Sequence, residues 1–336
     1  MKAFEIQGSF GLDHLTLVER PEPILAPGHV LVRLHAVSLN FRDLLMVQGL
    51  YNPKQPLPLI PLSDGAGEVV RVGDGVTRGK VGDRVMPSFA QRWLAGEPTK
   101  AKLLSALGGP LDGTLAEEKA FHEDGLVPVP AHLSWEEAAT LTCAGVTAWS
   151  ALVTQGGIKA GDTVVVLGTG GVSLFALQIA RLQGARVIVT SSSDAKLERA
   201  RALGASETIN YKTHPDWEKK IREMTGGTGA DHVVEVGGGG TFARSVRAVR
   251  VGGQISLIGV LAGATTDVNL APILMQNIRV QGVIVGSRET FEHLLRAVTQ
   301  HQLRPVVDRV FPFAEARAAF DHMAGQGHFG KIVVRM

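Results

Sequence analysis

The feature that most constrains the fold is an alternation of short apolar runs with helical segments between residues 163 and 257. Runs such as TVVVLG (163–168) and RVIVTSS (186–192) are each followed by a stretch with helical periodicity. Parallel strands that are buried on both faces have continuous apolar sequences, and helical crossovers connect them. The pattern therefore predicts an α/β fold with a doubly wound parallel sheet.

The rest of the chain has a different character. Short alternating apolar stretches, such as 29–37 (HVLVRLHAV) and 66–76 (AGEVVRVGDGV), are separated by Gly and Pro, which favours a β-rich first domain. The final segment has one helical pattern and one terminal strand, too little for a core of its own, so we expect it to fold back onto the first domain. The expected divisions are 1–127, 128–287 and 288–336.

Charge and composition exclude several classes of partner. The formal net charge is +2 and no Lys/Arg run occurs, so the chain lacks the basic surface that binds nucleic acid or an anionic membrane. The N-terminal stretch does not resemble a signal peptide, and no apolar run reaches the roughly 18 residues of a membrane span. A single cysteine forbids an intrachain disulfide. We expect a cytoplasmic protein that acts on a small-molecule substrate.

A glycine-rich loop, GTGGVS, joins the run TVVVLG to the next helical segment. A dinucleotide pyrophosphate needs a tight turn, a glycine that lets its oxygens approach the backbone, and the N–H groups of a helix start. Gly168 and Gly170 meet the first two needs, and Gly171 and Val172 begin the helix. Ser173 replaces the third glycine of G-x-G-x-x-G. A plain glycine turn is the alternative, but the surrounding strand and helix favour a dinucleotide site.

The end of the next strand predicts which dinucleotide binds. Enzymes that use NAD usually place a carboxylate there, which binds the ribose 2′-hydroxyl and would repel a 2′-phosphate. This chain has Ser191 and Ser192 there, with Lys196 one helical step further on. Hydroxyl groups and an ammonium group suit a phosphate. Asp194 is the competing feature, and we interpret it as a helix cap. The sequence therefore favours NADPH (NADP+) over NADH.

The whole order of elements resembles the medium-chain dehydrogenase/reductase superfamily. That resemblance implies a GroES-like catalytic domain, a Rossmann-type NADP-binding domain and a C-terminal return. It also implies a homodimer, because 278–286 (IRVQGVIVG) is similar to the strand that pairs across the subunit interface in this superfamily. The motifs that carry the resemblance are VGDRV (81–85), GAGEVVRVG (65–73), LTCAGVTAW (141–149), LGTGGVS (167–173), GA followed by TINY (204–211) and the terminal GK (330–331).

Zinc-dependent members of this superfamily hold a catalytic zinc with two cysteines and a histidine. The matching positions here are Asn40, Ser63 and Cys143, and the glutamate that follows the histidine is Asp64. A zinc site needs strong N or S ligands with supporting second-shell contacts. We therefore expect no zinc. Cys143 lacks a nearby histidine or cation that would make it a nucleophile, so we interpret it as the remnant of a metal site.

Zinc-independent members resemble quinone oxidoreductases and enoyl or alkenal reductases, and they carry an N-x-x-D stretch followed by a G-x-Y turn. Here these become Asn40, Asp43 and Tyr51. Asn40 could donate a hydrogen bond to a developing enolate or quinol oxygen, and Tyr51 could do the same or relay a proton. Asp43 would orient its neighbours. The alternatives stay open: Asn40 ends a strand, Asp43 caps a helix, and Tyr51 packs on the proline-rich loop.

The resemblance also assigns residues to the cofactor. Lys196 and Tyr211 match the residues that hold the 2′-phosphate in NADPH-using quinone reductases, although Tyr211 could also be a half-buried strand end. Thr147 matches a residue near the nicotinamide. Each of these assignments depends on the resemblance and not on spacing alone.

Five further residues complete the predicted cofactor site. Gly237, Gly259 and Val260 end strands at the carboxyl edge of the predicted sheet, where ligands bind in open α/β folds. Arg288 and Lys331 are additional cofactor candidates. Solvated surface positions are the alternative for both of these cations.

Together these features predict an NADPH-dependent, zinc-independent oxidoreductase that transfers hydride to a quinone, an enone or another conjugated carbonyl. Without a Lewis acid to polarise an alcohol or carbonyl oxygen, an acceptor that is already activated is favoured. Two alternatives remain: an NAD(P)-dependent alcohol dehydrogenase of the same superfamily, and a nucleotide-binding protein without turnover.

Overall fold

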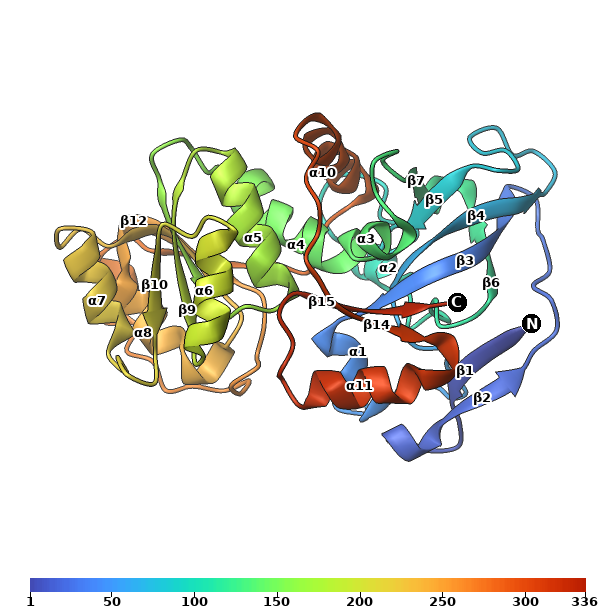
Figure 1. The fold of residues 1–336 in the computed structure, drawn as a ribbon, viewed down its shortest axis with the longest axis horizontal. Coiled ribbons are helices and arrows are strands. Elements are labelled where there is room, and N and C mark those ends of the chain that lie inside the picture. Colours follow the sequence, from blue (N-terminus) through green and yellow to red (C-terminus); the bar gives the residue numbers. More distant parts are fainter. The chain divides into compact units, whose positions relative to one another are not determined.

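The computed structural model describes residues 1–336 and divides them into two compact units (Figure 1). The first unit combines Met1–Val146 with Gly286–Met336, and the second comprises Thr147–Val285. Each unit contains a sheet of its own. The fold class predicted from the sequence is confirmed: a GroES-like unit and a Rossmann-type unit.

The first boundary lies later in the chain than the predicted residue 128. Strand β7 (Leu126–Pro128) pairs with β5 (Arg84–Pro87), and helix α3 (Trp135–Ala139) packs on β3 and β4 of the same sheet. These contacts keep residues 129–146 in the first unit. The chain re-enters this unit at Gly286, close to the predicted residue 288.

The sheet of the first unit has seven strands, and it determines where the C-terminal strand lies. Its order is β14-β15-β3-β4-β5-β7, with β6 also paired to β3. The last strand, β15, runs antiparallel to β3 and parallel to β14. A separate pair is formed by β1 and β2. Besides β5 and β7, the strands of this unit are β1 (Lys2–Ile6), β2 (Leu15–Glu19), β3 (His29–Leu39), β4 (Asp64–Val72), β6 (Glu118–His122), β14 (Val307–Pro312) and β15 (Lys331–Arg335).

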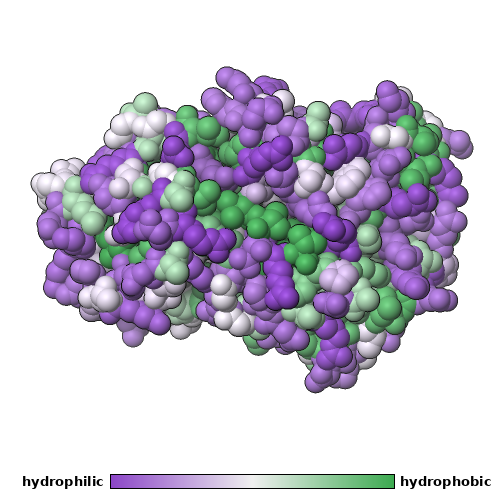
Figure 2. All heavy atoms as spheres, in the orientation of Figure 1, coloured by the Kyte–Doolittle hydropathy of each residue, from purple (hydrophilic) through white to green (hydrophobic).

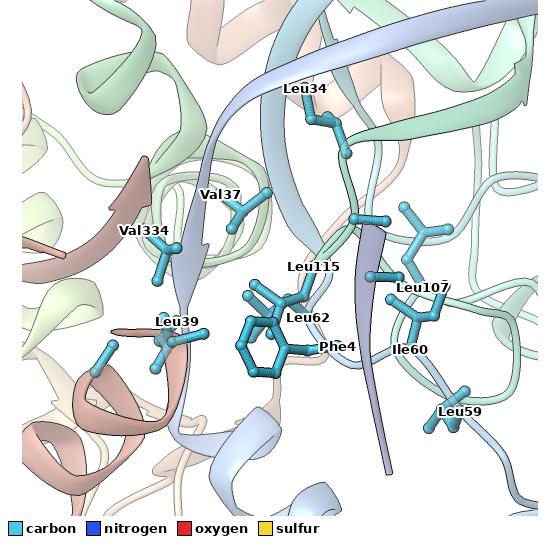
Figure 3. Close-up of a cluster of buried hydrophobic side chains, with 14 of the residues drawn as sticks. Phe4, Leu34, Val37, Leu39, Leu59, Ile60, Leu62, Leu107, Leu115 and Val334 are labelled. Atoms are coloured by element: carbon cyan, nitrogen blue, oxygen red, sulfur yellow. The ribbon is translucent and has the colours of Figure 1, made fainter. Parts of the chain in front are cut away.

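Alternating residues of these strands build one hydrophobic core. Figure 3 shows Phe4, Leu39, Leu115 and Val334 facing one another, although they come from distant parts of the sequence. All four side chains are buried, so the C-terminal strand contributes to the core of the N-terminal segment. The remaining helices of this unit are α1 (Phe41–Val47), α2 (Lys100–Leu103), α10 (Arg288–Gln300) and α11 (Ala316–Ala324).

The second unit contains a six-stranded sheet in which every pairing is parallel. Its order is β10-β9-β8-β11-β12-β13. The central strands are continuous apolar runs because helices cover both faces of the sheet (Figure 1). The strands are β8 (Thr163–Leu167), β9 (Arg186–Ser191), β10 (Glu207–Asn210), β11 (Ala230–Glu235), β12 (Val249–Leu257) and β13 (Arg279–Gly282).

The strand order reverses between β8 and β11. The chain moves outward from β8 through β9 to β10, and then returns to the other side of β8 at β11. Ligands bind at the carboxyl ends of the strands on either side of such a switch point. The helices of this part of the chain are α4 (Val146–Trp149), α5 (Gly171–Leu182), α6 (Asp194–Ala202), α7 (Trp217–Met224), α8 (Phe242–Ala248) and α9 (Ala271–Met275).

Most residues on the face shown in Figure 2 are hydrophilic, and the hydrophobic side chains between them form several connected groups. None of the helices combines the length and the apolar character that a membrane crossing requires. In the second unit, exposed large hydrophobic residues include Leu270, Leu274, Met275, Val280 and Ile284, which lie around α9 and β13.

Candidate functional site

The loop after β8 has the geometry of a phosphate-binding turn. Gly168 has a φ of 74°, a left-handed conformation that glycine adopts at no steric cost. Its N–H donates to the carbonyl of Thr190 on the adjacent strand, over 2.9 Å. The turn therefore ends the strand sharply and directs the chain into helix α5.

Open space lies over Gly170, the residue that precedes α5. A Cβ built at this glycine would meet no atom within 4 Å, and its φ of −79° is accessible to any residue. Gly171 and Val172 form the first turn of the helix, whose N–H groups have no partner within the helix. The free space and the free donors together fit the pyrophosphate of a dinucleotide.

Ser173 occupies the position of the third glycine and connects helix to strand. Its side chain is buried, and its hydroxyl donates to the carbonyl of Leu167 over 2.7 Å. A serine is thus small enough for close packing here, and it adds a hydrogen bond between α5 and β8. The departure from G-x-G-x-x-G does not disrupt the loop.

The sheet register brings the predicted 2′-phosphate residues to one edge. Ser191 ends β9 and pairs with Asn210 at the end of β10, and the N–H of Tyr211 donates to the Ser191 carbonyl over 3.0 Å. Ser192 follows Ser191, and Lys196 lies in the first turn of α6. Ser191, Ser192, Lys196 and Tyr211 therefore gather at the carboxyl ends of two adjacent strands.

The competing carboxylate, Asp194, lies at the same edge as Ser191 and Tyr211. It is the first residue of α6, and its Oδ1 accepts a hydrogen bond from Asn210 Nδ2 over 2.8 Å. The helix cap is Ser193, whose Oγ accepts from the N–H of Lys196. The expectation that Asp194 caps the helix was therefore wrong by one residue, because the serine oxygen reaches the free N–H group.

A buried carboxylate organises the end of β11, and the sequence analysis missed it. Glu235 is fully buried and accepts from the N–H groups of Gly237 and Gly238, over 2.7 and 3.0 Å. It also accepts from the hydroxyls of Thr241 and Ser245. The available signal was an acidic residue at the end of an apolar run, separated by one valine from four consecutive glycines.

The loops after β11 and β12 lie against each other. A Cβ at Gly259 would stand 2.5 Å from the carbonyl oxygen of Val236, so this approach requires glycine. The N–H of Ala262 donates to the carbonyl of Gly237 over 2.7 Å. Val260 is partly exposed in the same loop. The loops that contain Gly237, Gly259 and Val260 therefore lie at the carboxyl edge of the six-stranded sheet, as does the loop at Gly168.

Thr147 is the first residue of the second unit. It lies in α4, between two π-helical turns at Leu141–Gly145 and Ser150–Thr154, and its side chain is buried. Wide π turns often occur at functional positions. Its place beside the nicotinamide stays a prediction.

The first unit contains a buried polar cluster centred on Lys331. The ammonium group donates to the Leu39 carbonyl over 2.6 Å and to Asn40 Oδ1 over 2.7 Å, and it lies 3.3 Å from Asp64 Oδ2. Only 3% of the residue is exposed. An ammonium group has three N–H bonds, and all three are used here. These contacts occupy the side chain of Lys331 within the first unit, and its predicted contact with the cofactor stays a prediction.

Asp64 neutralises this charge from a fully buried position. Besides Lys331, its carboxylate accepts hydrogen bonds from the hydroxyls of Ser38 and Ser63, over 2.8 and 3.0 Å. A buried ion pair is tolerated when such additional bonds satisfy the charges. The charges of Lys331 and Asp64 thus neutralise each other within the cluster.

Cys143 lies in the π-helical turn at Leu141–Gly145 and is buried. Burial raises the pKa of its thiol far above the usual range, and the nearby Asp64 carboxylate acts in the same direction. Because burial disfavours the charged thiolate, the thiol is a poor nucleophile at neutral pH. This agrees with the interpretation of Cys143 as non-nucleophilic.

The donor set at the positions that match the zinc ligands does not fit zinc. Asn40 and Ser63 are weak ligands, Cys143 is the one strong ligand among the three positions, and the ammonium of Lys331 already lies between Asn40 and Asp64. No group of three or more His, Cys, Asp or Glu side chains is placed to hold a metal ion.

Asp43 acts as a positioning group at the start of α1. Its Oδ2 accepts from the backbone N–H of Asn40 over 2.8 Å, and its Oδ1 lies 3.1 Å from Arg42. Burial raises the pKa of Asp43, although the Arg42 guanidinium opposes that shift. The same guanidinium lies over the half-exposed ring of Tyr51, with Arg42 Cζ 4.8 Å from the centre of the ring. Asn40, Asp43 and Tyr51 thus belong to one local network.

Arg288 is also placed differently from the prediction. It begins α10 in the first unit and donates to the carbonyl of Asp124 over 2.9 Å. Its guanidinium also pairs with the carboxylates of Asp124 and Glu292, both at 3.3 Å. These contacts occupy the side chain within its own unit, so a cofactor role is not supported.

The open space at Gly170 gives a sharp test of the dinucleotide site. We expect Gly170→Ala to leave the melting temperature unchanged, because the added methyl group meets no protein atom. It should weaken NADPH binding about tenfold or more, roughly 1.4 kcal/mol, by occupying the space of the pyrophosphate. Calorimetric titration with NADPH measures this. Gly327→Ala, which is equally open, is the matched control; equal affinities for both variants would contradict the assignment.

Comparison with known proteins agrees with this geometry. The Alcohol dehydrogenase GroES-like domain model matches residues 26–131, and the Zinc-binding dehydrogenase model matches 171–300. The chain is 44% identical to a zinc-type alcohol dehydrogenase-like protein of Schizosaccharomyces pombe, over 97% of this chain and 96% of the relative. It is 33% identical to an alcohol dehydrogenase of Geobacillus stearothermophilus, over 96% of each.

Solved structures give the same result. A putative alcohol dehydrogenase from Sinorhizobium meliloti 1021 superposes with a TM-score of 0.93 at 42% identity, covering 100% of this chain and 98% of that one. An NAD-dependent alcohol dehydrogenase superposes with a TM-score of 0.92 at 36% identity, covering 100% of both chains. The chain is therefore an oxidoreductase of the medium-chain dehydrogenase/reductase superfamily.

Proposed function

We propose that this oxidoreductase uses NADPH, without zinc, to reduce a quinone, an enone or another conjugated carbonyl. The observation that carries the proposal is the cluster around Lys331. The ammonium group already neutralises Asp64 where a metal would lie, and Asn40 presents a buried amide nitrogen without a partner. The site therefore suits an acceptor that a hydrogen bond can activate.

The proposed chemistry follows from these groups. NADPH supplies a hydride, and in a conjugated acceptor the electron pair moves to the carbonyl oxygen as the hydride adds to carbon. Asn40 Nδ2 donates a hydrogen bond to that developing negative charge, which stabilises the transition state more than the ground state. The proton that completes the reduction comes from water or through the exposed hydroxyl of Tyr51.

The preference for NADPH is supported at the ends of β9 and β10. Ser191, Ser192, Lys196 and Tyr211 lie together there, and hydroxyl and ammonium groups suit a 2′-phosphate. The carboxylate of Asp194, which accepts a hydrogen bond from Asn210 at the same edge, is the one feature there that favours NADH instead.

Alcohol oxidation is the second candidate. It is favoured by the names of relatives, which include alcohol dehydrogenases at 33% and 32% identity. The donor set described above favours conjugated carbonyl reduction instead, because its one strong ligand, Cys143, is too few to hold a metal that would bind and polarise an alcohol oxygen.

One kinetic experiment tests the proposal. We expect the purified protein to oxidise NADPH in the presence of quinones or enones and to prefer NADPH over NADH. Lys196→Ala should lower kcat/KM for NADPH about tenfold, with little change for NADH, because a phosphate contact is lost. Lys219→Ala, at an exposed position in the first turn of α7, is the control.

Turnover of alcohols alone would favour the second candidate. Tight NADPH binding without turnover of either class would favour a nucleotide-binding protein. A preference for NADH that Lys196→Ala leaves unchanged would contradict the proposed cofactor.

We also propose that the protein is a homodimer that pairs through β13. All four residues of this edge strand are exposed, and Val280 and Ile284 are 40% and 48% exposed. Leu274 and Met275, in the preceding helix, are each 80% exposed. An exposed, partly apolar sheet edge is a natural surface for pairing with a second copy.

Light scattering tests this assembly. We expect a mass of about twice the 35.7 kDa of one chain. Val280→Lys should shift the protein toward monomer because a charge would be buried in the interface. Val251→Lys, at an exposed position in β12, should leave the mass unchanged. A wild-type protein that is monomeric at micromolar concentration would contradict the proposal.

A further inference from the structure

We propose that Lys331 is a positioning residue that fixes the amide of Asn40, so that Nδ2 is the group offered to the substrate oxygen. The inference rests on the proposed function, in which Asn40 stabilises the developing charge. It assigns a role to a buried lysine that makes no contact of its own with the substrate.

The chemistry of the contact determines which way the amide points. An ammonium group has only donors, so the atom of Asn40 that lies 2.7 Å from Lys331 Nζ must be the oxygen. The oxygen and nitrogen of an amide are otherwise assigned from their partners. With Oδ1 fixed in this way, Nδ2 is turned away from the lysine.

Three strands hold the lysine in place. Ile332 of β15 pairs with Leu39 of β3, which places Lys331 next to Asn40 at the end of β3. Asp64 at the start of β4 pairs with Ser38 of β3. The ammonium group is therefore bound to the Leu39 carbonyl and to Asp64 as well as to Asn40. It cannot follow a rotation of the amide without losing these contacts.

Asn40 is also held through its backbone. Its N–H donates to the buried carboxylate of Asp43 over 2.8 Å, at the start of α1. The residue is thus fixed at its backbone by Asp43 and at its amide oxygen by Lys331. Only the amide nitrogen is left without a bond.

That nitrogen is the second observation that points to a ligand. Asn40 Nδ2 has almost no accessible surface and no hydrogen-bond partner in the protein. Buried polar atoms in native proteins are nearly always paired. Asn40 is also the N-cap of α1, but the capping box uses its side chain as an acceptor and leaves Nδ2 unpaired. This nitrogen is therefore the group of Asn40 that a substrate oxygen would satisfy.

Isosteric variants test the proposal. Asn40→Asp keeps the oxygen that faces Lys331 and removes the donor, so we expect a loss of kcat of about 10²- to 10³-fold, as for other lost transition-state donors. Because this variant also adds a negative charge beside Asp64, Asn40→Leu, which removes the donor without adding a charge, is measured in parallel and should lose kcat to a similar extent. Lys331→Met alone would leave Asp64 unpaired and could prevent folding. We therefore combine it with Asp64→Asn, which keeps the cluster neutral.

The combined Lys331→Met/Asp64→Asn variant should lose at least about tenfold in kcat with little change in KM, because the amide is free to rotate. Adding Asn40→Ala to this variant should cost much less than Asn40→Ala costs in the wild type. Residues that act together give non-additive effects. If the loss in kcat from Asn40→Ala is as large in the combined variant as in the wild type, the two sites act independently and the proposal is overturned.

A second measurement separates this inference from the proposed function. The side-chain amide of Asn40 gives a pair of ¹H–¹⁵N resonances that Asn40→Asp removes. We expect slow hydrogen exchange for this pair in the wild type and fast exchange or broadening in the combined variant. Unchanged exchange would overturn the role of Lys331 even if no substrate is turned over. If the exchange pattern is as expected but the protein reduces neither quinones nor enones, the proposed function is overturned and the role of Lys331 is not.

Discussion

The buried ion pair between Lys331 and Asp64 determines much of the first unit. The two residues lie on β15 and β4, which flank β3, so the pair connects the C-terminal strand to the N-terminal sheet. Removal of one partner from such a pair costs about 3–5 kcal/mol because it leaves a buried charge. Ser38, Ser63, the Leu39 carbonyl and Asn40 supply the bonds that make this burial tolerable. The polar cluster and the C-terminal return are therefore parts of one arrangement.

The same pair accounts for the residues at the positions of the zinc ligands in a chain that matches a Zinc-binding dehydrogenase model. The positions that match the zinc ligands hold an amide, a hydroxyl and a single buried thiol, and the positive charge comes from an ammonium group. A metal would contact the substrate oxygen directly, whereas the ammonium acts through the amide of Asn40. The second unit provides a place for the pyrophosphate of a dinucleotide, because free space and helix N–H groups lie beside Gly170.

Much of the fold and the phosphate loop could be predicted from the sequence, because local sequence patterns determine them. Continuous apolar runs predicted the parallel sheet, and the loop at Gly168 predicted the turn after β8. The roles of Lys331 and Arg288 could not be predicted, because they depend on strand pairing and contacts between residues far apart in the chain. The boundary at Val146 was missed for the same reason, since α3 stays with the first unit through contacts with β3 and β4.

The most direct test of the central claim is the metal content of protein that turns over. Mass spectrometry of elements in an active preparation, before and after treatment with a strong zinc chelator, measures it. The arrangement of Lys331, Asp64 and Asn40 predicts zinc far below one atom per chain and the same rate of NADPH oxidation after chelation. One zinc atom per chain, whose removal abolishes turnover and whose return restores it, would contradict the account.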